Sequence, residues 1–148
     1  MQNLEKLKPL ALLLLRVGLG AIFIYHGYPK LFDNTREVMA NFSHMGFPPY
    51  FAYLSGTIEF FGGCLLIAGL FTRAAGLLLA GEMGVAVVQV HKLFAEPRAM
   101  HNYEFPLSLA LAAFTLAAVG AGAISLDAAI YGDGYPGPSG SRKARSKD

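Results

Sequence analysis

Four long apolar stretches alternate with short polar segments along the chain. In a window of about 19 residues they cover residues 10–28, 50–71, 74–94 and 105–126, and they contain 19, 22, 21 and 22 residues. A hydrocarbon core of roughly 30 Å is crossed by about 20 helical residues. The pattern therefore predicts an all-α fold, an integral membrane four-transmembrane-helix bundle.

The polar segments predict the domain organisation and the orientation. Residues 1–131 are expected to form a single transmembrane domain, and 132–148, rich in Gly, Pro and then basic residues, a flexible tail. The segments on the side of the two termini carry seven Lys and Arg residues, whereas the opposite loops carry four. Since short cytoplasmic loops carry the positive excess, we expect a multi-pass plasma-membrane protein with both termini cytoplasmic.

The connection after the first span, residues 33–49, is long for a loop between membrane helices. Asn34 followed by Glu37 resembles a helix capping box, and Val38, Phe42 and Met45 recur at helical spacing. A short amphipathic helix on the outer surface or over the mouth of the bundle would explain this pattern. An ordinary interfacial loop would explain it equally well.

Composition narrows the chemistry. Hydrophobic residues make up 54% of the chain and charged residues 15%, with a net charge of +2. This balance provides no broad basic surface for nucleic acid. The single cysteine, Cys64, excludes a disulfide within the chain, paired-thiol redox chemistry and a cysteine-based zinc cluster; no metal site is predicted. Gly76, Ala80 and Gly84 form a small-residue stripe of the kind that lets membrane helices pack closely.

Three ionisable side chains lie within the predicted spans. Arg16, Glu59 and Glu82 occupy mid-span positions, where such a group costs several kcal/mol unless it is paired or hydrated. Their predicted depths overlap within side-chain reach, so we expect Arg16 to pair with Glu59 or Glu82. The carboxyl left without a counter-charge would favour its protonated form and could carry a proton. A purely structural polar network predicts the same contacts.

A second polar group lies near the outer ends of the first and third spans. His26 and His91 are expected at similar depth, with Tyr28 and Lys30 nearby. These residues could bind a quinone or another ligand such as a metal or haem, and imidazole could relay protons. On the third span, Glu82 and His91 project from opposite faces, so one pocket cannot take both. Interfacial anchoring without chemistry is the alternative reading.

Several short motifs resemble a known family. These are RVGLGAIFIYHGYPKLF at 16–32 and IEFFGGCLLIAGLFTR at 58–73, followed by a third span that ends in His91. In order and spacing they are similar to the DoxX/DoxD family of small four-helix membrane proteins. Some members of that family are subunits of a thiosulfate:quinone oxidoreductase, and others associate with membrane redox-stress assemblies. The resemblance marks six positions: Arg16, His26, Lys30, Glu59, Arg73 and His91.

Two main functions and a third remain open from the sequence. The first is a membrane component of a quinone-linked oxidoreductase or redox-stress complex, with a bound quinone or a partner protein carrying electrons, because the chain lacks a dinucleotide-binding loop and a haem-attachment motif. The second is a non-catalytic scaffold or anchor for redox partners. The third is a small proton-coupled transporter. The expected partners are the lipid bilayer and a soluble or membrane redox protein, and a homo-oligomer is left open.

Overall fold

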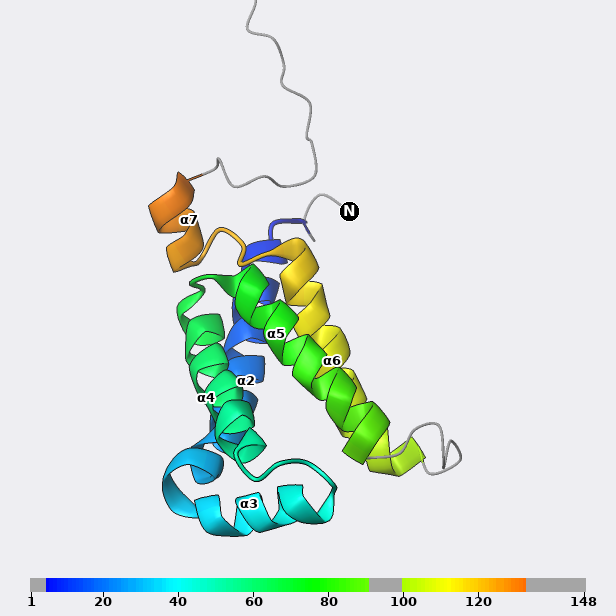
Figure 1. Cartoon of the computed structure of the whole chain (residues 1–148). Helices are drawn as coiled ribbons and strands as arrows, with labels where there is room; N and C mark the ends of the chain where they lie inside the picture. Colours follow the sequence, from blue (N-terminus) through cyan, green and yellow to red (C-terminus); the bar gives the residue numbers. More distant parts are fainter. Residues whose placement is uncertain (1–4, 91–99, 133–148) are drawn as a thin grey trace, which may run out of the picture.

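A computed structural model describes residues 5–90 and 100–132, and every regular element in these two ranges is helical (Figure 1). The elements are α2 (Lys8–Tyr28), η1 (Pro29–Asp33), α3 (Thr35–His44), α4 (Phe51–Ala68), α5 (Thr72–Val85), η2 (Ala86–Val90), α6 (Met100–Val119) and α7 (Leu126–Tyr131). The two η segments are π-helical and continue α2 and α5.

The predicted apolar spans correspond to α2, α4, α5 with η2, and α6. Two continuous helical segments, Lys8–Asp33 and Phe51–Ala68, are long and apolar enough to cross a membrane, and Tyr103–Val119 is a shorter apolar helix. The third predicted span is helical in the structure as far as Val90. Its last residues, 91–94, lie outside the described part of the chain. The all-α prediction is confirmed for the described ranges.

The fourth span ends earlier than predicted. Its helix stops at Val119, seven residues before the expected end at Leu126. Gly120 and Gly122 have φ angles of +93° and +79°, and this left-handed backbone cannot continue an α-helix. The chain then turns into α7, which Ser125 caps by accepting a hydrogen bond from the backbone N–H of Ala128 at 3.1 Å. The residues that follow Val119 are also largely apolar, so hydropathy alone did not indicate where the helix ends.

Glycines bring the long helices together in two pairs, α2 with α4 and α5 with α6. A Cβ atom added to Gly20 would lie 2.6 Å from the carbonyl oxygen of Gly63, and one added to Gly76 would lie 2.7 Å from that of Ala113. Only glycine allows backbones this close. The predicted stripe is therefore partly a packing surface, since Gly76 contacts α6 whereas Gly84 faces open space.

The two helix pairs meet near the α4–α5 turn and diverge toward α3 (Figure 1). Where they meet, Phe23, Leu66, Leu79 and Leu116 form the centre of a continuous apolar core. Toward the other end α3 lies across the space between the pairs (Figure 1). The divergence leaves room for a cavity in that half of the molecule.

The segment after α2 does contain the short helix considered from the sequence. It begins after Asn34, but Asn34 makes no side-chain capping bond, and its backbone N–H instead donates to the carbonyl oxygen of Pro29. The capping-box interpretation was therefore wrong, while the helix and its apolar positions Phe42 and Met45 are confirmed. Both side chains face the cavity described next.

Candidate functional site

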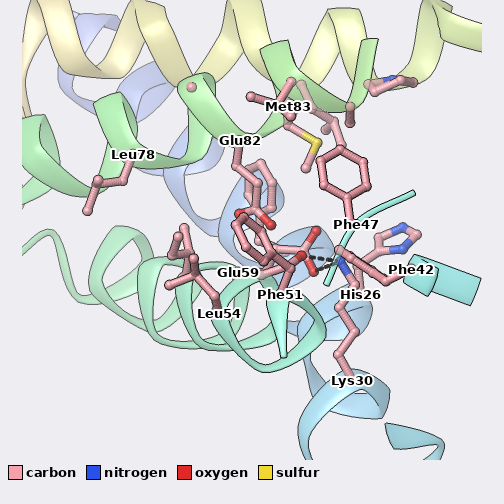
Figure 2. Close-up of a pocket in the computed structure, with 18 of the residues that line it drawn as sticks. His26, Lys30, Phe42, Phe47, Phe51, Leu54, Glu59, Leu78, Glu82 and Met83 are labelled. Carbon is pink, nitrogen blue, oxygen red and sulfur yellow. Dashed lines mark hydrogen bonds and ion pairs between the residues drawn. The ribbon is translucent and has the colours of Figure 1, made fainter. Parts of the chain in front are cut away.

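A cavity of about 760 Å³ lies between the two helix pairs at the α3 end. Its walls are mainly apolar and aromatic, with Phe42, Phe47 and Phe51 on the α3 side and Met83 on the α5 side (Figure 2). Ligand pockets in proteins are typically 300–1,000 Å³, apolar, and lined by a few convergent polar groups. The cavity has this size and these apolar walls, and it also has a few polar groups. Four polar residues line one part of it, which we call the polar end: Lys30, Ser55, Glu59 and Glu82.

An ion pair forms the centre of the polar end. The Lys30 ammonium nitrogen lies 2.6 Å from a carboxylate oxygen of Glu59 and donates a hydrogen bond to the Ser55 hydroxyl at 2.8 Å. The Glu59 side chain is only 3% exposed, whereas that of Lys30 is 20% exposed. Removing only one of the two charges would leave the other in an apolar surrounding, so each residue requires its partner.

The direction of helical side chains explains why these two residues meet. Side chains lean toward the N-terminus of their own helix. α2 and α4 run in opposite directions (Figure 1), so Lys30, on the π-helical extension of α2, leans back along α2, while Glu59 leans toward the start of α4. The two charged groups consequently approach each other from opposite ends of the helix pair.

Glu82 contributes the second acid from the opposite wall. Figure 2 shows its carboxyl group projecting from α5 toward Glu59. Both oxygens are buried, and neither makes a hydrogen bond of standard geometry among the described residues. Ser55, Glu59 and Lys30 are its interacting polar neighbours. Of the two acids at the polar end, Glu82 is thus the one that forms no ion pair within the described residues.

The residues of the outer group that the sequence predicted do not all lie at the cavity. His26 and Lys30 both line the cavity, and the His26 ring contacts Phe105 of α6 with ring centroids 5.8 Å apart. Tyr28 does not line it; its ring packs against Phe32 and Phe60 on an exposed face. His91 lies outside the described residues. Of the four predicted ligand-binding residues, the structure therefore brings two to the cavity.

Arg16 does not pair with either acid, which corrects the expectation from the sequence. Along the α2–α4 pair, Glu59 lies level with Gly27, whereas Arg16 lies level with Gly69. Ten residues of helix, about 15 Å, separate Glu59 from Gly69. The side chains of Arg16 and Glu59 also lean away from each other, because their helices are antiparallel. Depth counted from assumed span ends underestimated this separation.

The guanidinium of Arg16 is instead packed at the α7 end. It is 1% exposed and donates a hydrogen bond to the carbonyl oxygen of Ile124 at 2.5 Å. Asp127 is its interacting acid, and Gly69 contacts it so closely that a Cβ atom there would overlap the guanidinium. We call Arg16, Gly69, Ile124 and Asp127 the Arg16 cluster.

Asp127 ties this cluster to α5. Its two carboxylate oxygens accept hydrogen bonds from the backbone N–H groups of Phe71 and Thr72 at 2.8 Å and 3.0 Å, and its own N–H donates to the Gly69 carbonyl oxygen. A carboxylate at a helix N-terminus is favourable for capping and for the helix dipole. Arg73, the remaining family-pattern position, donates from the same turn to the Val119 carbonyl oxygen at 3.5 Å.

Sequence reasoning missed two parts of the site. Ser55 precedes Glu59 by four residues, a spacing that places both on one helix face, so this signal was present and unused. In the aromatic wall formed by Phe42, Phe47 and Phe51, Phe51 has the same signal, because it precedes Ser55 by four residues on α4. Phe42 and Phe47 had no comparable signal, since they face the cavity only because α3 folds back across the helix pairs.

Comparison of the sequence with known proteins decides the family. The DoxX family pattern matches residues 11–92, from α2 to just beyond η2. The chain belongs to the DoxX family. The matched region contains Lys30, Ser55, Glu59 and Glu82, so the polar end lies within the DoxX part of the chain. No solved structure gives a significant match.

Three of the similar proteins come from bacteria. A Bacillus subtilis (strain 168) protein named "Putative oxidoreductase CatD" is 38% identical over 119 residues, covering 80% of this chain and 86% of the relative. The inner membrane proteins YphA and YqjF of Escherichia coli (strain K12) are 35% and 29% identical; the matches cover 81% and 84% of this chain and 90% and 95% of the relatives. This DoxX chain is accordingly a membrane protein.

Proposed function

We propose that this DoxX chain is the membrane component of a quinone-linked oxidoreductase and that the cavity binds the quinone. The observation that carries the proposal is the cavity itself: a space of about 760 Å³ with apolar and aromatic walls and a charged end. The name of the relative CatD, which contains the word oxidoreductase, is consistent with this class of activity.

The chemistry of the lining fits a quinone ring. Flat aromatic side chains such as Phe47 and Phe51 offer surfaces on which a ring can stack. The Lys30 ammonium group and the His26 imidazole can donate hydrogen bonds to a quinone carbonyl oxygen. Glu82, on the opposite wall, can accept a hydrogen bond from a hydroxyl group of the reduced form. The same pocket thus has partners for both redox states.

The reaction of a quinone requires a source or acceptor of both electrons and protons. Reduction of a quinone to a quinol consumes two electrons and two protons, and oxidation releases them. Because the chain has one cysteine and neither a haem-attachment nor a dinucleotide-binding motif, we place the electron donor or acceptor on a redox partner protein. Glu82 is the group that we assign to proton exchange, since it lies at the cavity outside the Lys30–Glu59 pair.

We also propose four membrane crossings, by α2, α4, α5 with η2, and α6, with both termini cytoplasmic. Supporting this arrangement are the excess of positive residues on the side of the termini and the position of the start of α2 and of α7 at one end of the molecule (Figure 1). The cavity would then lie in the outer half of the plasma membrane. Reporter fusions at residues 33–34 and 71 test the orientation, with opposite locations expected.

The binding experiment uses the full chain purified in mild detergent. Organic extraction followed by mass spectrometry should recover a quinone, and a short-tailed benzoquinone should bind the extracted protein. Glu82→Gln should weaken binding of the reduced form by about tenfold, because the amide oxygen that replaces the carboxylate is an uncharged and weaker acceptor. The matched control is Glu37→Gln, an exposed acid of α3, which should bind as the wild type does.

Other results would overturn the proposal. If neither the oxidised nor the reduced benzoquinone binds, and a partner protein copurifies in fixed stoichiometry, the scaffold function is the better description. Proton-coupled flux of a solute into proteoliposomes, abolished by Glu82→Gln and unaffected by quinones, would indicate a transporter instead.

A further inference from the structure

The cavity has an apolar opening on one side, between α4 and α5. Leu54, Leu77 and Leu78 line the cavity, yet their side chains are 50%, 60% and 60% exposed. A residue that both lines a cavity and reaches the protein surface lies at the rim of an opening. In a membrane protein, surface at this level of the helices faces acyl chains, and these three side chains suit that environment.

The other sides of the cavity are crossed by contacts between elements, although exposed residues also lie there. Toward the α7 end, Leu79 packs so tightly on Gly62 that a Cβ atom there would lie 3.2 Å from it. Between α2 and α6, the rings of His26 and Phe105 are in contact, but both residues are exposed, so this side has a rim that includes a polar side chain.

Toward the end that α3 crosses, the side chains of Phe42, Met45 and Phe47 line the cavity. Figure 2 shows Phe42 and Phe47 on this side and Leu54 and Leu78 on the other. The α4–α5 side therefore combines exposure with an entirely apolar rim, whereas the α2–α6 side includes the exposed His26. The α3 end, where Met45 is 40% exposed, faces the aqueous surface in the proposed arrangement.

Solvation decides which route a ligand with an apolar chain would take. A chain that left the cavity past α3 toward the aqueous surface would expose its methylene groups to water, at about 0.8 kcal/mol each. A chain that left between α4 and α5 would pass from an apolar pocket into lipid of similar polarity, without this cost. The polar end, meanwhile, holds the hydrogen-bonding part of the ligand.

We propose that the ligand enters sideways from the lipid through a portal framed by Leu54, Leu77 and Leu78. In the bound state a long apolar chain of the ligand occupies this portal. This inference rests on the proposed function and specifies it further: the substrates are lipid-soluble quinones whose ring reaches Lys30 and Glu82 while the chain lies between α4 and α5. Water-soluble quinones without a chain would be poor substrates because they are dilute in the membrane.

A photoreactive ligand tests the route directly. The probe is a benzoquinone with a decyl chain that carries a diazirine, irradiated with the full chain in proteoliposomes. Peptide mapping should find adducts on residues 54–58 and 77–82, and an excess of the decyl benzoquinone without the diazirine should suppress them. Competed adducts on α3 or around Phe105 would overturn the portal and leave the quinone site intact. Labelling that no quinone competes would count against the quinone site itself.

Bulky substitutions at the rim provide the second test. Leu54→Trp and Leu78→Trp should weaken binding of the decyl benzoquinone by about tenfold through crowding, while the same ring with a methyl group in place of the chain should bind as tightly as in the wild type. The matched control, Leu111→Trp on α6, alters a residue that is also 60% exposed but is not part of the cavity lining. Equal loss for both ligands, or none for either, would overturn the portal.

Discussion

The polar end and the Arg16 cluster use similar groups in opposite ways. Both contain a basic side chain and a carboxylate beside a glycine-lined contact between α2 and α4. In the Arg16 cluster the guanidinium is enclosed by protein: it is 1% exposed, and Gly69 is pressed against it. At the polar end the same kinds of charge border a cavity of about 760 Å³.

This difference separates stability from ligand binding. The Arg16 guanidinium is enclosed by a backbone carbonyl group, a glycine and a helix N-terminus, and it connects α2, the α4–α5 turn and α7. The polar end contains one structural pair, Lys30–Glu59, and one acid outside that pair, Glu82. If this division is correct, substitutions in the Arg16 cluster should change stability alone, whereas substitutions at the polar end should also change ligand binding.

The largest effect is expected when the buried ion pair is broken. Lys30→Met should lower the free energy of unfolding by about 3–5 kcal/mol, because Glu59 would remain charged or be forced to neutralise in an apolar surrounding. Chemical unfolding in detergent measures this change. Lys8→Met, which alters an exposed lysine near the start of α2, is the control and should change it by less than about 0.5 kcal/mol.

A double variant sharpens the result. Lys30→Met combined with Glu59→Leu removes both charges and should recover most of the lost stability, since apolar replacements of a whole buried pair are often neutral. Quinone binding should stay impaired in the double variant, because the donor to the ring is still missing. Recovery of binding together with stability would mean that Lys30 acts only on the fold.

The next effect concerns the Arg16 cluster. Gly69→Ala should cost about 2–4 kcal/mol, because its φ of +68° is strained for any side chain and its Cβ would overlap the Arg16 guanidinium. Gly18→Ala on α2 is the matched control: it has open space around it and should be neutral or stabilising by up to about 1 kcal/mol. Equal thermal midpoints for the two variants would refute the packed cluster.

The helices themselves were readable from the sequence, and the pairing of charges was not. Hydropathy located α2, α4, α5 and α6 because each of them is a continuous apolar run in the sequence. Depth along a span ignores two facts that decide contacts: the register between helices and the lean of side chains. Gly20 against Gly63 sets the register, and only with it does Lys30, rather than Arg16, become the partner of Glu59.

Long-range contacts set the remaining limit. Asp127 caps α5 from 55 residues away, and no local spacing in the sequence indicates such a bond. The same holds for α3, whose amphipathic pattern was visible but whose place across the cavity depends on the π-helical turn at Pro29–Asp33. His26 and Lys30, two members of the predicted outer group, both line the cavity, and their role in ligand binding stays a prediction.

A smaller effect is expected from the cap. Asp127→Ala should lower stability by about 1–2 kcal/mol, the usual cost of removing a helix cap, because the N–H groups of Phe71 and Thr72 lose their acceptor. Asp33→Ala, at an exposed position after α2, is the control. Quinone affinity should be the same in both variants, and a loss of affinity in Asp127→Ala would show that the two regions are coupled.

The smallest effect on stability is expected at Glu82, and it distinguishes the two regions most sharply. A buried carboxyl without a hydrogen bond of standard geometry contributes little to the fold and carries a desolvation cost of roughly 1–3 kcal/mol. Glu82→Leu should therefore leave the free energy of unfolding unchanged or raise it by about 1 kcal/mol, while quinol binding falls. Such a trade of stability for function is typical of binding sites. A destabilisation as large as that of Lys30→Met would instead make Glu82 a structural partner of the pair, and the polar end would then resemble the Arg16 cluster.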